Sequence, residues 1–189
     1  MMPPAFTSAA GGRVANLVLR QPAAATLWHG RSVTIRPVQP DDEFGEQAFV
    51  KGLSPASRYS RFHFGLRELP PALLSRMIHV DQRRHVAVVA QATDDVGDEE
   101  IAADARYVLR DDSDDGEFAI VVADAWQGLG LGRQLMQHLL ALARRNGVPR
   151  LFGDVLRSNL PMIALVRRLG GSLTRHPDDW TLTRASFTL

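Results

Sequence analysis

The chain has 189 residues, a length typical of one globular domain. Hydrophobic residues make up 45% and charged residues 23%, so the chain can bury a core of ordinary size. The sequence contains no cysteine, which excludes disulfides, cysteine nucleophiles and thiolate metal sites. The net charge of +1 provides no overall attraction to nucleic acid or to an anionic membrane, and no apolar run approaches the roughly 18 residues of a membrane-spanning helix.

The charges are unevenly distributed along the chain. Residues 94–117 contain eleven carboxylates, and residues 126–189 contain nine arginines against three aspartates. The acidic segment is typical of a solvated turn between strands, although it would also attract a cationic substrate. The arginine-rich half indicates either an anionic cofactor or the outer faces of helices. Arginine supplies every basic side chain except Lys51.

The first half of the chain begins with residues 1–30, which are rich in alanine, proline and glycine and are predicted to form a flexible or accessory tail. The folded domain is expected to span residues 31–189. Alternating polar and apolar residues predict a first strand, and capping residues and apolar stripes predict three helices before two further strands. The expected elements are strand 32–36, helices 43–53, 54–60 and 70–80, and strands 85–91 and 101–109.

The second half continues with a strongly apolar strand at 117–123, followed by a glycine-rich turn and a long amphipathic helix that ends near Asn146. A strand at 151–156, a helix at 159–169 and a final strand at 180–188 complete the chain. Several antiparallel strands combined with two strand-to-helix units indicate a mixed α/β layered domain.

The most informative motif is Phe118–Arg133, which reads FAIVVADAWQGLGLGR. An apolar strand runs into a turn with three glycines, and a helix starts there. Glycines allow the main chain to approach a ligand closely, and a helix N-terminus directs N–H groups and a positive dipole end at it. The motif therefore predicts a phosphate or pyrophosphate site built from the backbone.

Other phosphate-binding motifs fit this turn poorly. A nucleotide P-loop requires Lys and Ser or Thr after its last glycine, where this chain has Arg133 and Gln134. The dinucleotide fingerprint G-x-G-x-x-G fits in neither possible register. A Q-x-x-G-x-G pyrophosphate loop fits at Gln127, Gly130 and Gly132, and a tight turn without a ligand is the remaining alternative.

This strand, loop and helix resemble the signature of the GNAT superfamily of acyl-CoA-dependent N-acetyltransferases. The resemblance covers about residues 32–187. The catalytic domain of bacterial Pat-type protein lysine acetyltransferases is similar in further segments: Gly52–Tyr59 with Phe62, Leu66–Leu69, Ala105–Tyr107 and Glu117–Ala119. The resemblance implies the GNAT fold, a mostly antiparallel central sheet of six to seven strands with helices on both faces.

The resemblance also implies a site for acetyl-CoA as co-substrate, between strands 117–123 and 151–156. Backbone groups of Ile120 and Val122 would pair with the pantetheine arm, and the Ile120 N–H would be a candidate oxyanion donor. Asn159 would contact the pantetheine, cap the following helix, or do both. The expected cofactor-binding residues are Ile120, Val121, Val122, Gln127, Gly128, Leu129, Gly130, Leu131, Gly132, Arg133 and Asn159.

Glu117 is the candidate catalytic residue, because an amine nucleophile must lose a proton and the resemblance implies a glutamate base on this strand. Asp115 and Asp104 are the alternatives. Many family members have a tyrosine as general acid where this chain has Val166, and Tyr107 is an alternative donor that is expected to pack against the sheet.

The segment Arg58–Phe64 interleaves basic and aromatic residues. It is too short, in a chain of near-zero net charge, to indicate nucleic-acid binding, and it is expected to pack beneath the substrate groove with Tyr59 and Phe62 inward. The six histidines show no spacing typical of a metal site, so no metal is expected.

We therefore expect an N-acetyltransferase that moves an acetyl group from acetyl-CoA to a primary amine by direct attack in a ternary complex. The preferred acceptor is a protein lysine ε-amine, an expectation that rests on the Pat resemblance alone. A small-molecule amine acceptor and a non-catalytic acyl-CoA-binding regulator are the alternatives. The chain is expected to be a cytoplasmic monomer or homodimer with no nucleic-acid or membrane partner.

Overall fold

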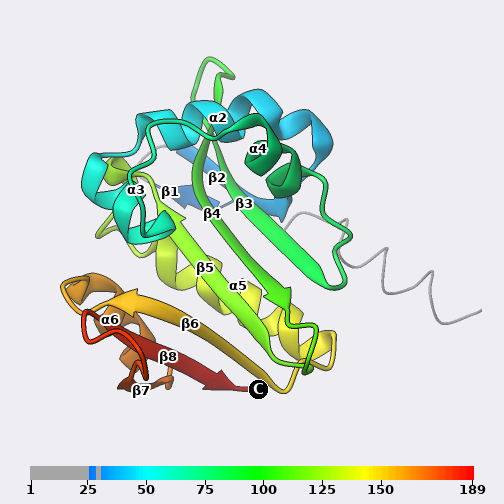
Figure 1. Cartoon of the computed structure of the whole chain (residues 1–189). Helices are drawn as coiled ribbons and strands as arrows, with labels where there is room; N and C mark the ends of the chain where they lie inside the picture. The colour runs from blue at the N-terminus through cyan, green and yellow to red at the C-terminus, as the bar shows by residue number, and fades with distance from the viewer. Residues whose placement is uncertain (1–25, 29–30) are drawn as a thin grey trace, which may run out of the picture.

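The computed structural model describes residues 26–28 and 31–189, and these residues form one twisted sheet with helices on both faces (Figure 1). The strands are β1 (Thr26–Trp28), β2 (Arg31–Pro37), β3 (His85–Thr93), β4 (Glu99–Leu109), β5 (Gly116–Val122), β6 (Arg150–Leu156), β7 (Ser172–Arg175) and β8 (Leu182–Thr188). The α-helices are α2 (Glu43–Gly52), α3 (Pro55–Phe62), α4 (Pro71–Ile78), α5 (Leu131–Arg145) and α6 (Leu160–Arg168).

The strand order across the sheet is β1-β2-β3-β4-β5-β6-β8-β7. Neighbouring strands are antiparallel except β5 and β6, which are parallel and pair only at Gly116 with Leu151 and at Glu117 with Phe152. Beyond these two pairs the strands separate, and Figure 1 shows them spreading apart toward α3 and α6. The sheet is therefore forked in its middle.

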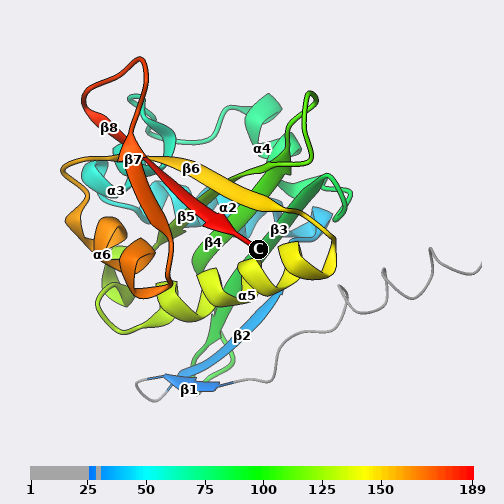
Figure 2. The ribbon, with the colours of Figure 1, turned by 90° about the horizontal axis from the view of Figure 1, so that it is seen from below.

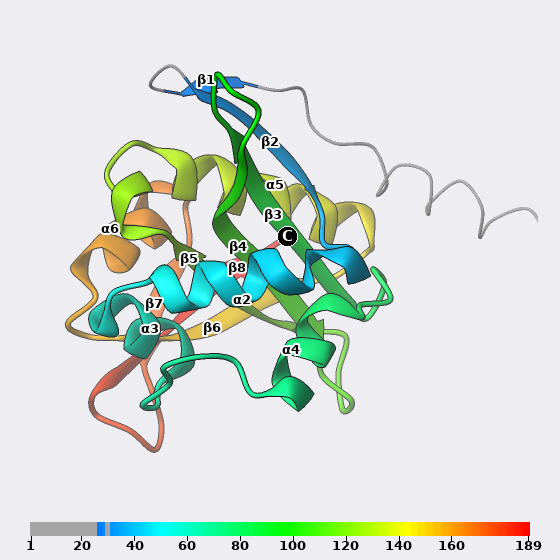
Figure 3. The same cartoon turned by 90° about the horizontal axis from the view of Figure 1, so that it is seen from above.

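Two hydrophobic clusters hold helices against the two faces of the sheet. α5 and α6 pack on one face (Figure 2), where Leu131, Leu135 and Leu139 of α5 are fully buried. Their spacing of four residues places them on one stripe of the helix. α2, α3 and α4 cover the opposite face (Figure 3), where Val50 and Leu69 are buried. The fork lies between these layers.

The predicted mixed α/β fold is confirmed, and each predicted strand and helix end lies within two residues of the observed end. The described part of the sheet has eight strands rather than six or seven. β7 was missed because its four residues are mostly exposed and carry no clear apolar alternation. β1 pairs with β2 although it lies inside the segment predicted as a tail. The rest of residues 1–30 lies outside the described residues, and the domain boundary at residue 31 stays a prediction.

Candidate active site

The fork leaves backbone groups of β5 without a neighbouring strand. Hydrogen bonds from Ala123 N–H to Ala102 C=O and from Arg110 N–H to Asp115 C=O, both 2.9 Å, fix which residue pairs bond across β4 and β5. Since bonded and non-bonded pairs alternate in an antiparallel ladder, the backbone groups of every second β5 residue point away from β4. Ile120 lies in this set, and so does Val122 two residues later.

A cavity of about 720 Å³ opens on this side of β5, between α3, the glycine-rich loop and α6. We call it the larger cavity. Nine of the predicted cofactor residues line it: Ile120, Val121, Val122, Gln127, Gly128, Gly130, Gly132, Arg133 and Asn159. Leu129 and Leu131 do not line it, and the Leu131 side chain is buried in the core. The structure therefore brings most of the predicted residues together around one space.

The glycine-rich loop takes a shape that other residues resist. Gly128 and Gly130 have φ values of +74° and +90°, a region that costs a residue with a Cβ roughly 1–2 kcal/mol. A Cβ on Gly132 would lie 3.3 Å from Val122 Cγ2, so a side chain there would crowd β5. α5 begins at Leu131, and its first N–H groups have no intrahelical acceptors. Such a loop and helix terminus fit a diphosphate.

Gln127 braces the loop in this structure. Its Nε2 donates to the Val122 carbonyl at 3.0 Å and to Ser57 Oγ of α3 at 3.1 Å. Nearby, the Asp124 carboxylate accepts hydrogen bonds from the Ser54 N–H and from the hydroxyls of Ser54 and Ser57, each 2.8 Å long. Burial opposes ionisation of Asp124, but these hydrogen bonds outweigh it and lower the pKa of the carboxyl. Sequence reasoning missed this joint between α3 and the loop.

Asn159 caps α6, because its Oδ1 accepts a hydrogen bond from the Met162 N–H at 3.1 Å. Its side-chain amide nitrogen remains available toward the cavity that it lines. Arg133 and Arg168 line the same cavity, and neither forms an ion pair with another described residue. The larger cavity thus combines backbone donors with two free guanidinium groups.

A second cavity of about 460 Å³, which we call the smaller cavity, lies between β5, β6, α3 and α4. Its carboxylates are those of Glu117 and Asp154. Asp154 is paired with Arg184 at 2.9 Å and with His176 at 3.2 Å. Glu117 is exposed and has no hydrogen bond or ion pair within the described part of the chain, so its carboxylate is free.

The two alternative acids lie elsewhere. Asp115 is paired with Arg150, whose Nε lies 3.1 Å from its Oδ2, and Asp104 is buried against Arg106. Neither lines either cavity. Of the three acids that the sequence offers, Glu117 is the one that lines a cavity and has no partner among the described residues.

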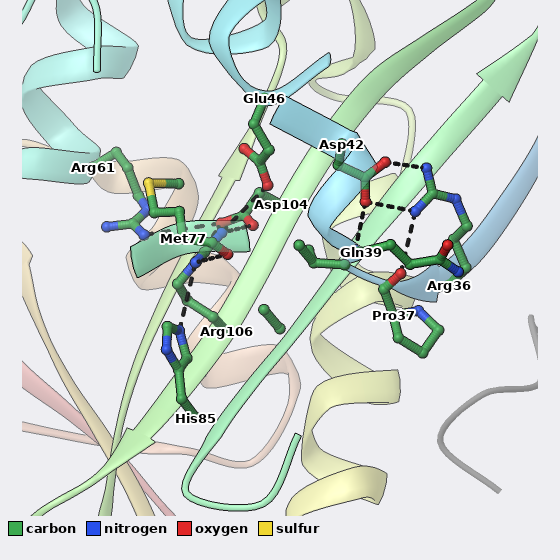
Figure 4. Close-up of polar contacts among 12 residues, drawn as sticks. Arg36, Pro37, Gln39, Asp42, Glu46, Arg61, Met77, His85, Asp104 and Arg106 are labelled. Carbon is green, nitrogen blue, oxygen red and sulfur yellow. Dashed lines mark hydrogen bonds and ion pairs between the residues drawn. The ribbon is translucent and has the colours of Figure 1, made fainter. Parts of the chain in front are cut away.

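A buried cluster of titratable groups, which the sequence reasoning missed, adjoins the smaller cavity, because Arg106 and His85 of the cluster line it. Figure 4 shows the contacts within this cluster. Arg106 donates to Asp104, to Glu46 Oε1 at 3.3 Å and to the Met77 carbonyl at 3.0 Å. Burial, together with the charge of Asp104, raises the pKa of Glu46 to about 8. Burial and the charge of Arg106 lower the pKa of His85 to about 4. At neutral pH both groups are therefore uncharged.

Three other expectations have clear outcomes. Tyr107 is fully buried and accepts a hydrogen bond from Asn146 Nδ2 at 2.7 Å, which confirms that it packs against the sheet. Val166 is fully buried in the core. The inward placement of Tyr59 is wrong, because its side chain is half exposed, whereas Phe62 and Arg61 turn toward the smaller cavity. The aromatic-basic alternation could not show which face of α3 is buried.

Comparison with known proteins decides the family. Residues 56–171 match the model of the Acetyltransferase (GNAT) family. The chain belongs to this family. It is 38% identical to acetyltransferase PA5475 of Pseudomonas aeruginosa over 82% of this chain and 83% of that protein. It is also 33% identical to acetyltransferase Pat of Mycolicibacterium smegmatis, in a match that covers 75% of this chain and 41% of the length of that protein.

Solved structures agree with this GNAT assignment. The GNAT domain of S. lividans PAT superimposes with a TM-score of 0.78 at 28% identity, covering 88% of this chain and 96% of that one. A cAMP-binding acyltransferase from Mycobacterium smegmatis superimposes with a TM-score of 0.56 at 29% identity, covering 92% of this chain and 49% of that one.

The GNAT chain is therefore an acetyl-CoA-dependent N-acetyltransferase. Acetyl-CoA is the co-substrate of this family. No helix in the described residues is long and apolar enough to cross a membrane.

Proposed function

We propose that the larger cavity holds acetyl-CoA and the smaller cavity holds the acceptor, which is a lysine ε-amine of a protein. The observation that carries this proposal is the fork between β5 and β6, with the glycine-rich loop on one side and a free Glu117 on the other. The two cavities share Ile120, so a thioester in one and an amine in the other would meet at this residue.

The residues of the larger cavity would hold the cofactor in an extended form. N–H groups of the glycine-rich loop and of the first turn of α5 would bind the pyrophosphate, with Arg133 adding a charge-assisted contact. The backbone groups of Ile120 would bond the pantetheine as a strand would, and Asn159 would contact it from α6. Acetyl-CoA supplies an activated thioester carbonyl, and the Ile120 N–H is the candidate donor to its oxygen.

Glu117 would act as the general base. Its carboxylate lies at the start of β5 and faces the smaller cavity, where it can take a proton from the attacking amine directly or through a water molecule. The chain has no cysteine, and we propose direct attack of the amine on the thioester in a ternary complex. With Val166 buried where many family members have a tyrosine, the thiolate would leave without a tyrosine acid from that position.

The protein-lysine acceptor rests on the relatives named Pat in both comparisons. A thiol-release assay with acetyl-CoA tests it, using a lysine-rich histone mixture and polylysine against spermidine and an aminoglycoside. We expect faster turnover with the proteins. Turnover restricted to the small amines would assign a small-molecule acceptor, and tight CoA binding without turnover on any amine would favour a non-catalytic regulator.

A further inference from the structure

Arg61 of α3 lies where the two cavities meet. Five residues line both cavities, namely Ser60, Arg61, Ile120, Asn159 and Met162. Arg61 is the charged residue in this set, and its side chain is only 12% exposed. A nearly buried cation therefore stands beside the position at which the thioester and the amine would meet.

The Arg61 guanidinium has no hydrogen-bond acceptor within the described part of the chain. Its Nε is buried without a partner, and its Nη2 lies 3.8 Å from Asp104 Oδ1, beyond hydrogen-bond distance. The Asp104 oxygens are already bonded by Arg106 (Figure 4). An arginine has five N–H donors, and buried donors are nearly always satisfied. A hydrogen-bond acceptor on a bound ligand would satisfy the free N–H donors of Arg61.

The charges around Arg61 favour a ligand oxygen that becomes negative. The charges of Asp104 and Arg106 cancel, and Glu46 and His85 are uncharged at neutral pH for the reasons given above. The buried cluster together with Arg61 therefore has one uncompensated positive charge, that of the Arg61 guanidinium. Glu117 is the acid outside the cluster whose charge acts on Arg61.

The reaction would neutralise the Glu117 carboxylate, whose negative charge balances Arg61, as the amine attacks. As the amine nitrogen forms its bond to the thioester carbon, Glu117 takes the amine proton and becomes neutral. The carbonyl oxygen gains the electron pair of the C=O π bond and becomes negative. When the oxygen returns this pair, the C–S bond breaks and CoA leaves as the thiolate. A fixed cation at the junction interacts more strongly with this transition state than with the neutral thioester.

We infer that Arg61 is a catalytic residue that donates a hydrogen bond to the thioester carbonyl oxygen as the amine attacks, alongside the Ile120 N–H. This inference rests on the proposed function of the two cavities. It assigns the buried guanidinium a role that neither the glycine-rich loop nor Glu117 can supply, because the first binds the cofactor and the second handles the proton.

Arg58 provides a matched control on the same helix. Its guanidinium donates to the carbonyl oxygens at the end of α2, among them Lys51 at 3.1 Å, and it lines neither cavity. Arg58→Met removes a partly buried arginine from α3 without touching the junction. We expect it to lower the Tm while kcat stays unchanged.

The experiment compares Arg61→Met and Arg61→Lys with the wild type, using acetyl-CoA and the best acceptor from the thiol-release panel. We expect Arg61→Met to lower kcat by about 100-fold, the effect of losing one oxyanion donor, with the Kd for CoA within about threefold of wild type. Arg61→Lys keeps the charge and should lose only about 10-fold in kcat. In Arg61→Ala, added methylguanidine should restore part of the lost turnover.

Three results would overturn the inference. The first is a kcat of Arg61→Met within about threefold of wild type. The second is a parallel loss of CoA affinity and kcat in Arg61→Met. The third is a folded Arg61→Ala whose turnover methylguanidine does not restore. If Arg61→Met does not fold, unchanged kcat in a folded Arg61→Lys would overturn it as well. A wild-type protein that acetylates no amine would instead overturn the proposed function, together with everything that rests on it.

Discussion

The two cavities on either side of the fork are built in different ways. One wall of the larger cavity is a continuous segment, from β5 through the glycine-rich loop into α5, whose donors belong largely to the main chain, and α3 and α6 form the other walls. The smaller cavity collects side chains from α3, α4, β3, β4, β5 and β6. Backbone donors do not depend on side-chain identity, whereas the contacts that the smaller cavity offers are set by its individual side chains.

The two cavities also differ in electrostatics. The larger one has the N-terminus of α5 and the free Arg133, which suit an anion. The smaller one has a free carboxylate at Glu117 and is lined on another side by Arg106, the centre of the buried cluster. Disrupting the first should abolish cofactor binding, and disrupting the second should slow the reaction while cofactor binding persists.

The largest expected effect comes from the loop. Gly130→Glu places a Cβ at φ +90° and a carboxylate where the pyrophosphate would lie, so we expect CoA affinity to fall by on the order of 100-fold or more. Isothermal titration calorimetry measures it. Gly147→Glu is the matched control, because Gly147 has φ +73° just beyond the other end of α5 with open space around it. The Gly147→Glu variant should lose stability and keep its affinity for CoA. Unchanged CoA affinity in Gly130→Glu would show that the glycine-rich loop does not bind the pyrophosphate.

Glu117→Gln tests the smaller cavity. The amide cannot take a proton, so we expect kcat to fall by about 100-fold with the Kd for CoA unchanged. Steady-state kinetics at saturating acetyl-CoA measure the effect. Asp115→Asn is the control, since Asp115 is paired with Arg150 outside both cavities and its loss should leave kcat intact. A Glu117→Gln variant with wild-type turnover at every pH would remove this residue as the base.

Much of the fold could be predicted from the sequence, because apolar alternation, capping residues and the glycine-rich turn are local signals. The same holds for the loop Gln127–Gly132, whose shape depends on contiguous backbone and on its glycines. The charged cluster could not be predicted. Glu46 and Arg106 are 60 residues apart in the chain, and nothing near either position shows that tertiary packing will bury them together. Arg61 could not be identified either, because the basic-aromatic alternation of Arg58–Phe64 does not show which face of α3 is buried.

The buried cluster predicts a pH dependence of stability. The pKa of Glu46 is 4.5 in the unfolded chain and about 8 in the folded protein. Between these two pH values the folded protein binds the Glu46 proton and the unfolded chain does not, so the free energy of unfolding falls as pH rises. His85 acts in the opposite direction between about 4 and 6.5. Above pH 6.5 Glu46 acts without this opposition, and we expect the wild type to lose up to about 2 kcal/mol by pH 8.

Urea unfolding at pH 6.5 and pH 8 measures this loss. Glu46→Gln stays neutral at both values and should show little change between them. An equal loss in the wild type and in Glu46→Gln would show that Glu46 is not the group responsible.

The smallest expected effect concerns the joint between α3 and the loop. Asp124→Asn weakens the hydrogen bonds from Ser54 and Ser57, and we expect a loss of about 1 kcal/mol in stability and a modest rise in KM for acetyl-CoA. Asp95→Asn, on the exposed loop between β3 and β4, is the control and should change neither quantity. Unchanged thermal and kinetic behaviour of Asp124→Asn would show that the joint does not support the cavity.

The most direct test of the division between the two cavities is a crystal structure with a bisubstrate analogue in which CoA is linked to the ε-nitrogen of a lysine peptide. The account predicts the pyrophosphate on the loop Gln127–Gly132, the pantetheine along Ile120 and Val122, and the lysine nitrogen beside Glu117. Electron density for CoA outside the larger cavity, or for the peptide on a face away from Glu117, would contradict it.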